Sequence, residues 1–315
     1  RRTGLNPLTD LRSLLSLAAL FRRLKPDIVL GYTIKPVIYG SLAARWAGVP
    51  AIYSIITGLG YAFSGTSPGQ RAIGSVVRVL YRLSLAGNRK VFFQNPDDRA
   101  LFGELGILRS PDQAVLVSGS GVDLDRFRPA PLPERAAFLM VARLVKEKGV
   151  HEYVEAARRL KQKYPGTAFR LVGWIDERLG AIRAGDLEGW VKDGVIEYLG
   201  RLDDVRPAIA GCSVYVLPSY REGTPRTVLE AMAMGRPVVT TDAPGCRETV
   251  REGHNGFRVP VRDAVALAAA MERFIATPAL IPEMGGKSLA LAVEKYDVRK
   301  VNAAILEAMD LEAGQ

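Results

Sequence analysis

The stretch PSYREGTPRTVLEAMAMGRPVVTTDAPG, which spans Pro218–Gly245, decides the predicted fold of this chain. It follows Ser213–Leu217 (SVYVL), an apolar run that is typical of a buried strand. Thr224 is predicted to cap a helix, and Pro225 suits its first turn, where a missing N–H costs nothing. Pro237–Thr241 (PVVTT) predicts a second buried strand. A strand, a loop and a helix N-terminus together present free backbone N–H groups, which favours an anionic ligand.

Two carboxylates accompany this predicted anion site. Glu222 lies in the loop, and Glu230 follows eight positions later on the helix. Beside a phosphate both would be repulsive, unless they accept hydrogen bonds from hydroxyl groups of the same ligand. A nucleotide-sugar offers phosphates for the helix end, and sugar and ribose hydroxyls for the acids. An ordinary strand–loop–helix crossover with solvated acids explains the same residues, so the pattern alone leaves both interpretations open.

The length and composition of the chain allow two α/β domains. The chain has 315 residues, of which 48% are hydrophobic, enough for two such domains. Cys212 and Cys246 lie near apolar strands, which favours small core residues in a reducing compartment over a disulfide. Two histidines, His151 and His254, are too few for a histidine-based metal cage. No run reaches the roughly 18 apolar residues that a membrane span needs.

The net charge of +10 is unevenly distributed. Residues 1–130 carry 17 lysines and arginines against 8 acidic residues, whereas residues 131–315 carry 26 against 25. The first half therefore favours an anionic partner. Ser67–Arg89 is predicted to form a helix with Arg71, Arg78 and Arg82 on one face, which suits an anionic membrane surface. A solvated face on a core helix is the alternative.

Strands and helices alternate along the chain, the pattern of parallel doubly wound sheets. In the first half, GYTIKP (Gly31–Pro36) and TGLGYAF (Thr57–Phe63) follow predicted strands, and ligands gather at the carboxyl ends of such strands. These loops are candidate acceptor sites, with a plain connection as the alternative for the second. The candidate acceptor-binding residues are Tyr32, Lys35, Gly58, Gly60 and Tyr61.

Two cations bracket a strand-to-helix loop in the second half. Arg143 and Lys148 follow the predicted strand AFLMV and precede a predicted amphipathic helix, Val150–Tyr164. Facing the helix end at Pro225, they can stabilise the charge that develops on a departing nucleoside diphosphate. Taken alone, two cations in a loop are also ordinary surface charges.

Three motifs resemble one known family. Glu222-x7-Glu230 followed by AMAMG-x-PVV is similar to the donor-site signature of retaining GT-B glycosyltransferases of family 4. The spacing from Arg143 to Lys148-Gly matches the diphosphate-binding pair of that family. GSGVDLDRFRP (Gly119–Pro129) resembles its interdomain hinge, with serine replacing the usual asparagine. The D-x-D formed by Asp123 and Asp125 is therefore interpreted as turn capping, not as a metal site.

The resemblance implies two Rossmann-like domains that face each other across a cleft. The expected divisions are 1–127 for an acceptor- and membrane-facing domain, 128–290 for the donor domain, and 291–315 for a helix that crosses back. Arg143, Lys148 and Glu222 would be catalytic. Glu222 would hold the donor sugar, and Glu230 the ribose. The expected donor-binding residues are Gly173, Gly200, Arg201, Gly223, Thr224, Pro225, Arg226, Thr227 and Glu230.

Within that family, the first half looks like enzymes that extend undecaprenyl-diphosphate-linked sugars. The implied function is retaining transfer of a hexose or N-acetylhexosamine from a UDP-sugar to a lipid-linked or other glycan acceptor. It would take place at the inner face of the cytoplasmic membrane, without a cofactor or a metal and without nucleic acid. A soluble family-4 enzyme with a non-lipid acceptor and a UDP-sugar epimerase are the alternatives. Relatives begin with a further strand and a glycine-rich loop, so we expect the first domain to be short at its N-terminus.

Overall fold

The computed structural model describes residues 7–58, 68–176 and 180–311 and divides into two compact units. The first comprises Arg1–Gly119 and Val301–Gln315, and the second comprises Ser120–Lys300. The predicted divisions at 127/128 and 290/291 stay predictions. Each unit contains one parallel sheet, so the predicted class of two α/β domains is confirmed.

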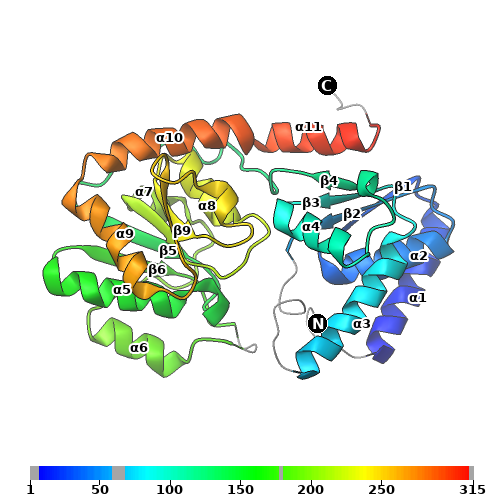
Figure 1. Cartoon of the computed structure of the whole chain (residues 1–315), viewed down its shortest axis with the longest axis horizontal. Helices are drawn as coiled ribbons and strands as arrows, with labels where there is room; N and C mark the ends of the chain where they lie inside the picture. The colour runs from blue at the N-terminus through cyan, green and yellow to red at the C-terminus, as the bar shows by residue number, and fades with distance from the viewer. Residues whose placement is uncertain (1–6, 59–67, 177–179, 312–315) are drawn as a thin grey trace. The chain divides into compact units, whose positions relative to one another are not determined.

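The first unit is built on a four-stranded parallel sheet with the order β1-β2-β3-β4 (Figure 1). The strands are β1 (Ile28–Tyr32), β2 (Ala51–Ile56), β3 (Lys90–Phe93) and β4 (Ala114–Leu116). The helices are α1 (Pro7–Leu24), the π-helical turn η1 (Pro36–Gly40), α2 (Ser41–Trp46), α3 (Pro68–Leu85), α4 (Pro96–Glu104) and α11 (Val298–Ala308).

Alternation along β3 shows how the first sheet is covered. Phe92 packs on one face with Tyr53 and Met309, at the end of α11. Phe93 packs on the other face, against Tyr81 of α3 and Phe102 of α4. Because successive strand residues point to opposite faces, these neighbours belong to two different apolar clusters. The Tyr53 hydroxyl also donates to the carbonyl of Met309 over 3.1 Å, which fixes the end of α11 in this unit.

The second unit is built on a six-stranded parallel sheet with the order β10-β9-β8-β5-β6-β7. The strands are β5 (Ala137–Val141), β6 (Ala168–Val172), β7 (Glu197–Tyr198), β8 (Val214–Leu217), β9 (Val238–Thr241) and β10 (Gly256–Val259). The helices are α5 (Val150–Lys163), α6 (Ala184–Lys192), α7 (Arg206–Ala210), α8 (Arg226–Ala233), α9 (Ala264–Ala276) and α10 (Leu280–Lys295), with short 3₁₀ turns at Lys146–Lys148 and Arg247–Thr249.

This strand order reverses between β5 and β8, which are neighbours although they are distant in sequence. Figure 1 shows α5 and α9 together on one side of the sheet and α8 with α10 on the other. In open parallel sheets, ligands bind outside the carboxyl ends of the strands at such a switch point. The fold therefore directs attention to the loops that follow β5 and β8.

Some local predictions are wrong. The helix predicted from Ser67 to Arg89 already ends at Leu85, because Ala86 and Gly87 form a turn before β3. The sequence over Ser288–Ala313 predicts one continuous helix, but the structure has the end of α10 and then α11, with a break at Tyr296, whose hydroxyl donates to the carbonyl of Glu248 over 2.6 Å. That buried tyrosine holds the chain at the break.

Asn95 caps α4 by accepting a hydrogen bond from the backbone N–H of Asp98 over 2.8 Å. Two local predictions are confirmed. Asp123 accepts hydrogen bonds from the N–H groups of Asp125 and Arg126, so the D-x-D pair is a capped turn. Both cysteines are buried free thiols.

Among the described residues, no single helix is both long and apolar enough to cross a bilayer, and α9 with α10 meets that test only as a pair bent by 109°.

Candidate active site

The predicted donor-site residues of the second unit lie on loops at one edge of its sheet. The residues Pro218–Pro225, here called the donor loop, follow β8, and the loop with Arg143 and Lys148 follows β5. Since all six strands are parallel, their carboxyl ends meet at the same edge. Gly173 and Gly200, which follow β6 and β7, lie at this edge as well.

Lys148 and Glu222 form an ion pair between the loops after β5 and β8. Their side chains are 20% and 13% exposed, so water screens the pair only in part. The hydroxyl of Ser219 donates to the same carboxylate oxygen, Glu222 Oε1, over 2.7 Å. The two residues predicted for the diphosphate and for the sugar therefore touch each other at the switch point.

Two glycines hold the donor loop from either side. Gly149 has φ +74°, and a Cβ there would lie 2.1 Å from the carbonyl oxygen of Pro218. Gly245 has φ +81°, and a Cβ there would lie 2.3 Å from the carbonyl oxygen of Glu222. Both positions need glycine for backbone conformation and for close approach. The glycine after Lys148 in the R-x4-K-G pattern thus fixes the backbone on which the second motif lies.

Arg143 is paired with Asp176, in the loop after β6, over 3.0 Å. Backbone hydrogen bonds join the two loops: Leu144 N–H donates to Trp174 O over 2.9 Å, and Lys146 N–H donates to Gly180 O over 2.8 Å. The guanidinium is 42% exposed, so it keeps access to solvent beside this carboxylate. Arg143 and Lys148 are therefore both balanced by carboxylates in the structure.

The N-terminus of α8 differs from its prediction. Pro225, not Thr224, is the N-cap, and no side chain caps the helix. The Pro225 carbonyl accepts hydrogen bonds from Val228 and Leu229, so the helix begins at Arg226. No side chain among the described residues caps this helix end, where the first backbone N–H groups are those of Arg226 and Thr227. These N–H groups are the donors that a helix end offers to an anion.

Glu230 lies one turn into α8 and is 9% exposed. Burial raises the pKa of its carboxyl group, an effect that the charges of Arg226 and Arg126 oppose. Its closest cation, the Arg226 guanidinium, is 3.7 Å away. A mostly buried carboxylate whose paired guanidinium is 69% exposed is only partly compensated, which is typical of a residue kept for a ligand.

Gly173, Gly200 and Arg201 are close together at the ends of β6 and β7. The Gly173 N–H donates to the carbonyl of Gly200 over 2.8 Å. The Arg201 guanidinium lies over the ring of Trp174, 5.2 Å from its centroid, and that ring is 43% exposed. Sequence reasoning missed Trp174, although its place directly after Gly173 was a usable signal.

In the first unit, the predicted acceptor residue Tyr32 ends β1, and Lys35 lies in the loop that follows it. Tyr32 is 45% exposed. Lys35 donates to Asp10 of α1 over 2.7 Å, and Tyr39 donates to the other oxygen of that carboxylate over 3.0 Å. Thr33 has φ +72°, a strained conformation for a β-branched residue. Gly58 follows β2 and is half-buried, whereas Gly60 and Tyr61 lie outside the described residues.

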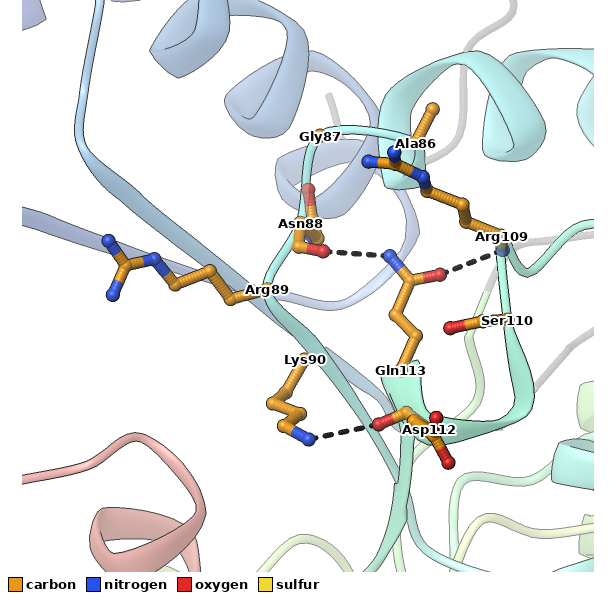
Figure 2. Close-up of a pocket in the computed structure, with 9 residues that line it drawn as sticks. All are labelled: Ala86, Gly87, Asn88, Arg89, Lys90, Arg109, Ser110, Asp112 and Gln113. Atoms are coloured by element: carbon orange, nitrogen blue, oxygen red, sulfur yellow. Dashed lines mark hydrogen bonds between the residues drawn. The ribbon is translucent and has the colours of Figure 1, made fainter.

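A pocket of about 390 Å³ lies at the opposite, amino-terminal end of β3 (Figure 2). Gln113 crosses it by donating to the Asn88 carbonyl over 2.8 Å and accepting from the Arg109 N–H over 3.0 Å. Lys90 donates to the carbonyl of Asp112 over 3.0 Å. These contacts join two turns, and none of the predicted site residues lines the pocket. It is separate from the candidate site.

Comparisons with known proteins identify the family of each half of the chain. Residues 135–277 match the family described as glycosyl transferases group 1, and residues 1–95 match the family described as glycosyl transferase 4-like. The chain is 29% identical to N,N'-diacetylbacillosaminyl-diphospho-undecaprenol alpha-1,3-N-acetylgalactosaminyltransferase of Campylobacter jejuni, over 85% of this chain and 72% of that protein. It is 28% identical to UDP-Gal:alpha-D-GlcNAc-diphosphoundecaprenol alpha-1,3-galactosyltransferase of Escherichia coli, over 84% and 70% of the two chains.

Solved structures share the fold. The crystal structure of Anabaena HepE in complex with UDP has a TM-score of 0.79 at 19% identity, covering 94% of this chain and 81% of that one. Sucrose-phosphate synthase from Thermosynechococcus elongatus has a TM-score of 0.79 at 22% identity, covering 93% and 75%. The two family matches lie in different units, and the strand order of the second unit fits the same architecture. The chain therefore belongs to the group 1 glycosyltransferases, enzymes of the GT-B fold.

Proposed function

We propose that this enzyme transfers a hexose or N-acetylhexosamine from a UDP-sugar to a lipid-diphosphate-linked saccharide, with retention at the anomeric carbon. The observation that carries the donor half is the contact between Lys148 and Glu222 at the switch point of the second sheet. One ligand that bears both a diphosphate and sugar hydroxyls explains why a cation and a carboxylate meet there. The names of the Campylobacter and Escherichia relatives, which act on diphospho-undecaprenol saccharides, support the acceptor class.

The reaction breaks the bond between the anomeric carbon and the β-phosphate oxygen, and the electron pair leaves with UDP. Arg143 and Lys148 stabilise the charge that develops on the diphosphate, together with the two N–H groups that begin α8. The acceptor hydroxyl attacks from the face that the diphosphate leaves, and its proton passes to a phosphate oxygen. These cations take the role that a divalent metal has in other transferases.

Two carboxylates orient the donor. Glu222 accepts hydrogen bonds from hydroxyl groups of the transferred sugar, and Glu230 accepts them from the ribose. Gly173, Gly200 and Arg201 bind the nucleotide base, next to the exposed ring of Trp174. Gly223 and Thr224 complete the donor loop. In the first unit, Tyr32, Lys35 and Gly58 contact the acceptor, and the strained backbone at Thr33 supports a functional role for that loop.

We also assign the first unit to the cytoplasmic face of an anionic membrane. Helix α3 exposes apolar side chains beside cations, with Val76 60%, Val79 56% and Leu83 52% exposed. Arg78 and Arg82 lie on the same helix and are exposed. Apolar side chains enter the headgroup boundary while arginines bind lipid phosphates. An acceptor anchored in the bilayer would require this attachment.

The test of transfer uses the purified chain, short-chain lipid-diphosphate saccharides and a panel of UDP-hexoses and UDP-N-acetylhexosamines. We expect Lys148→Ala and Glu222→Ala to lower transfer by about 10²–10³-fold, the usual effect of removing one donor to a developing charge. A matched control pair is Lys163 and Glu272, which form an exposed ion pair on α5 and α9. Wild-type rates in the two site variants would refute the assignment.

Attachment is tested by flotation with vesicles that contain anionic lipid, at low and high salt. Binding that falls with salt and with Arg78→Gln/Arg82→Gln supports the assignment. Binding that is absent, or indifferent to salt, would exclude it.

A further inference from the structure

Ser219 is a completely buried residue whose hydroxyl points to a charged side chain. Its exposure is 0%, and its Oγ lies 2.7 Å from Glu222 Oε1. Its own backbone is held from the neighbouring strand, because Thr241 at the end of β9 donates its hydroxyl to the Ser219 carbonyl. The thiol of Cys246 lies 3.9 Å from the same carbonyl oxygen. The serine thus connects the end of β9 to the carboxylate.

We propose that Ser219 is a positioning residue that sets the orientation of the Glu222 carboxylate toward the donor sugar. The proposal rests on the proposed role of Glu222. Lys148 and Ser219 both contact the same oxygen of Glu222. Binding of the nucleotide-sugar is expected to affect these two contacts differently. When the Lys148 ammonium binds a diphosphate, its charge is shared between the diphosphate and Glu222. The buried Ser219 hydroxyl is neutral and continues to donate to Glu222 alone.

The rigidity of the surroundings supports this role. Glu222 N–H donates to the carbonyl of Pro244 over 2.9 Å, and Gly245 packs against the Glu222 carbonyl. The backbone at Glu222 is therefore fixed, so the remaining freedom lies in its side-chain torsions. A hydrogen bond to a charged acceptor is among the stronger ones in proteins, which suits a bond that selects one rotamer.

The experiment measures binding of UDP and of the most rapidly transferred UDP-sugar by titration calorimetry, together with kcat and KM. Ser219→Ala should weaken UDP-sugar binding and lower kcat/KM by about tenfold or more, the usual worth of a charged hydrogen bond. Binding of UDP, which lacks the sugar, should stay within about twofold of wild type. Ser219→Cys keeps a weak hydrogen-bond donor, so its UDP-sugar affinity and kcat/KM should lie between those of wild type and Ser219→Ala.

The matched control is Ser213→Ala. Ser213 is 2% exposed in the same unit, and among the described residues its hydroxyl bonds to backbone groups alone, at Ala137 and Arg135. This control should change neither ligand's affinity. In the Glu222→Ala background, Ser219→Ala should cause no further loss, because its effect acts through that carboxylate.

Two results would overturn the inference while leaving the proposed function intact. Loss of UDP and UDP-sugar binding in parallel, matched by a lower Tm, would make Ser219 a structural residue. A full additional loss in the Glu222→Ala background would show that it acts elsewhere. If wild type fails to bind UDP-sugar, or Glu222→Ala behaves as wild type, the proposed function fails and this inference falls with it.

Discussion

Replacing Glu222 by glutamine is expected to strengthen UDP binding while it weakens sugar transfer. The carboxylate partly neutralises the Lys148 ammonium before any ligand arrives. Glutamine has nearly the same shape and still offers an oxygen to Ser219 and Lys148, but it carries no charge. UDP lacks the sugar that Glu222 is proposed to hold, so it gains a more positive site and loses no contact.

The size of the gain follows from the geometry of the ion pair. A phosphate oxygen that shares the ammonium with the carboxylate would lie roughly 5 Å from it, since each charge-assisted bond is about 2.8 Å long. Two unit charges at this separation repel by roughly 0.8 kcal/mol in water and about 3 kcal/mol at an effective dielectric constant of 20. With the two side chains 20% and 13% exposed, screening reduces the effect to about 1–2 kcal/mol, or roughly five- to thirtyfold in Kd.

Calorimetric titration with UDP, together with transfer assays, measures both effects. The control is Glu272→Gln, which removes the carboxylate from Lys163, a lysine that is 67% exposed and far along α5 from the donor loop. We expect tighter UDP binding and at least tenfold slower transfer in Glu222→Gln alone. Weaker or unchanged UDP binding in that variant would refute the idea that Lys148 binds the diphosphate.

Three further variants test individual features. Burial raises the pKa of Glu230, so the folded chain holds the proton of this carboxyl group more tightly than the unfolded chain does. The folded state therefore loses stability as pH rises above the ordinary glutamate pKa. Glu230→Gln should raise the Tm at pH 7–8, and this gain should vanish at low pH. Arg236 is 1% exposed and donates to five backbone carbonyls, so Arg236→Met should cost about 3–5 kcal/mol in urea unfolding. Gly149→Ala should displace the donor loop and weaken UDP binding at least tenfold, whereas Gly189→Ala, with open space around it, should not.

The second unit was largely predictable because its signals are local. Each buried strand is a short apolar run, and each following loop is marked by glycine, proline or charge. Glu222 and Lys148 could be assigned to one edge of a sheet without knowing their contact, since parallel strands bring their carboxyl ends together. The cap of α8 was mispredicted because Thr224 and Pro225 both suit a helix start, and only the backbone at Pro225 decides between them.

Contacts between distant segments were not predictable. Asp10 and Lys35 are separated by 25 positions and by a strand, and no periodicity links them. Asp176 meets Arg143 only because backbone bonds pair the loops after β5 and β6. Ser219 looks like any residue at a strand end until its hydroxyl is seen on Glu222. Long-range pairing of this kind depends on register and packing, which one sequence does not reveal.

The pairing of Lys35 changes how the charge of the first half is interpreted. Binding of an acceptor diphosphate is one explanation for the excess of cations in the first half. However, Lys35, the lysine in the candidate acceptor loop after β1, is already balanced by Asp10. Arg78 and Arg82 are instead exposed on α3, beside exposed Val79 and Leu83. Cations placed among apolar side chains suit a lipid surface better than a small anion. The cations contact the lipid phosphates, and the apolar side chains enter the boundary between headgroups and acyl chains. The exposed arginines of α3 therefore support the proposed membrane attachment more than direct binding of the acceptor's phosphates.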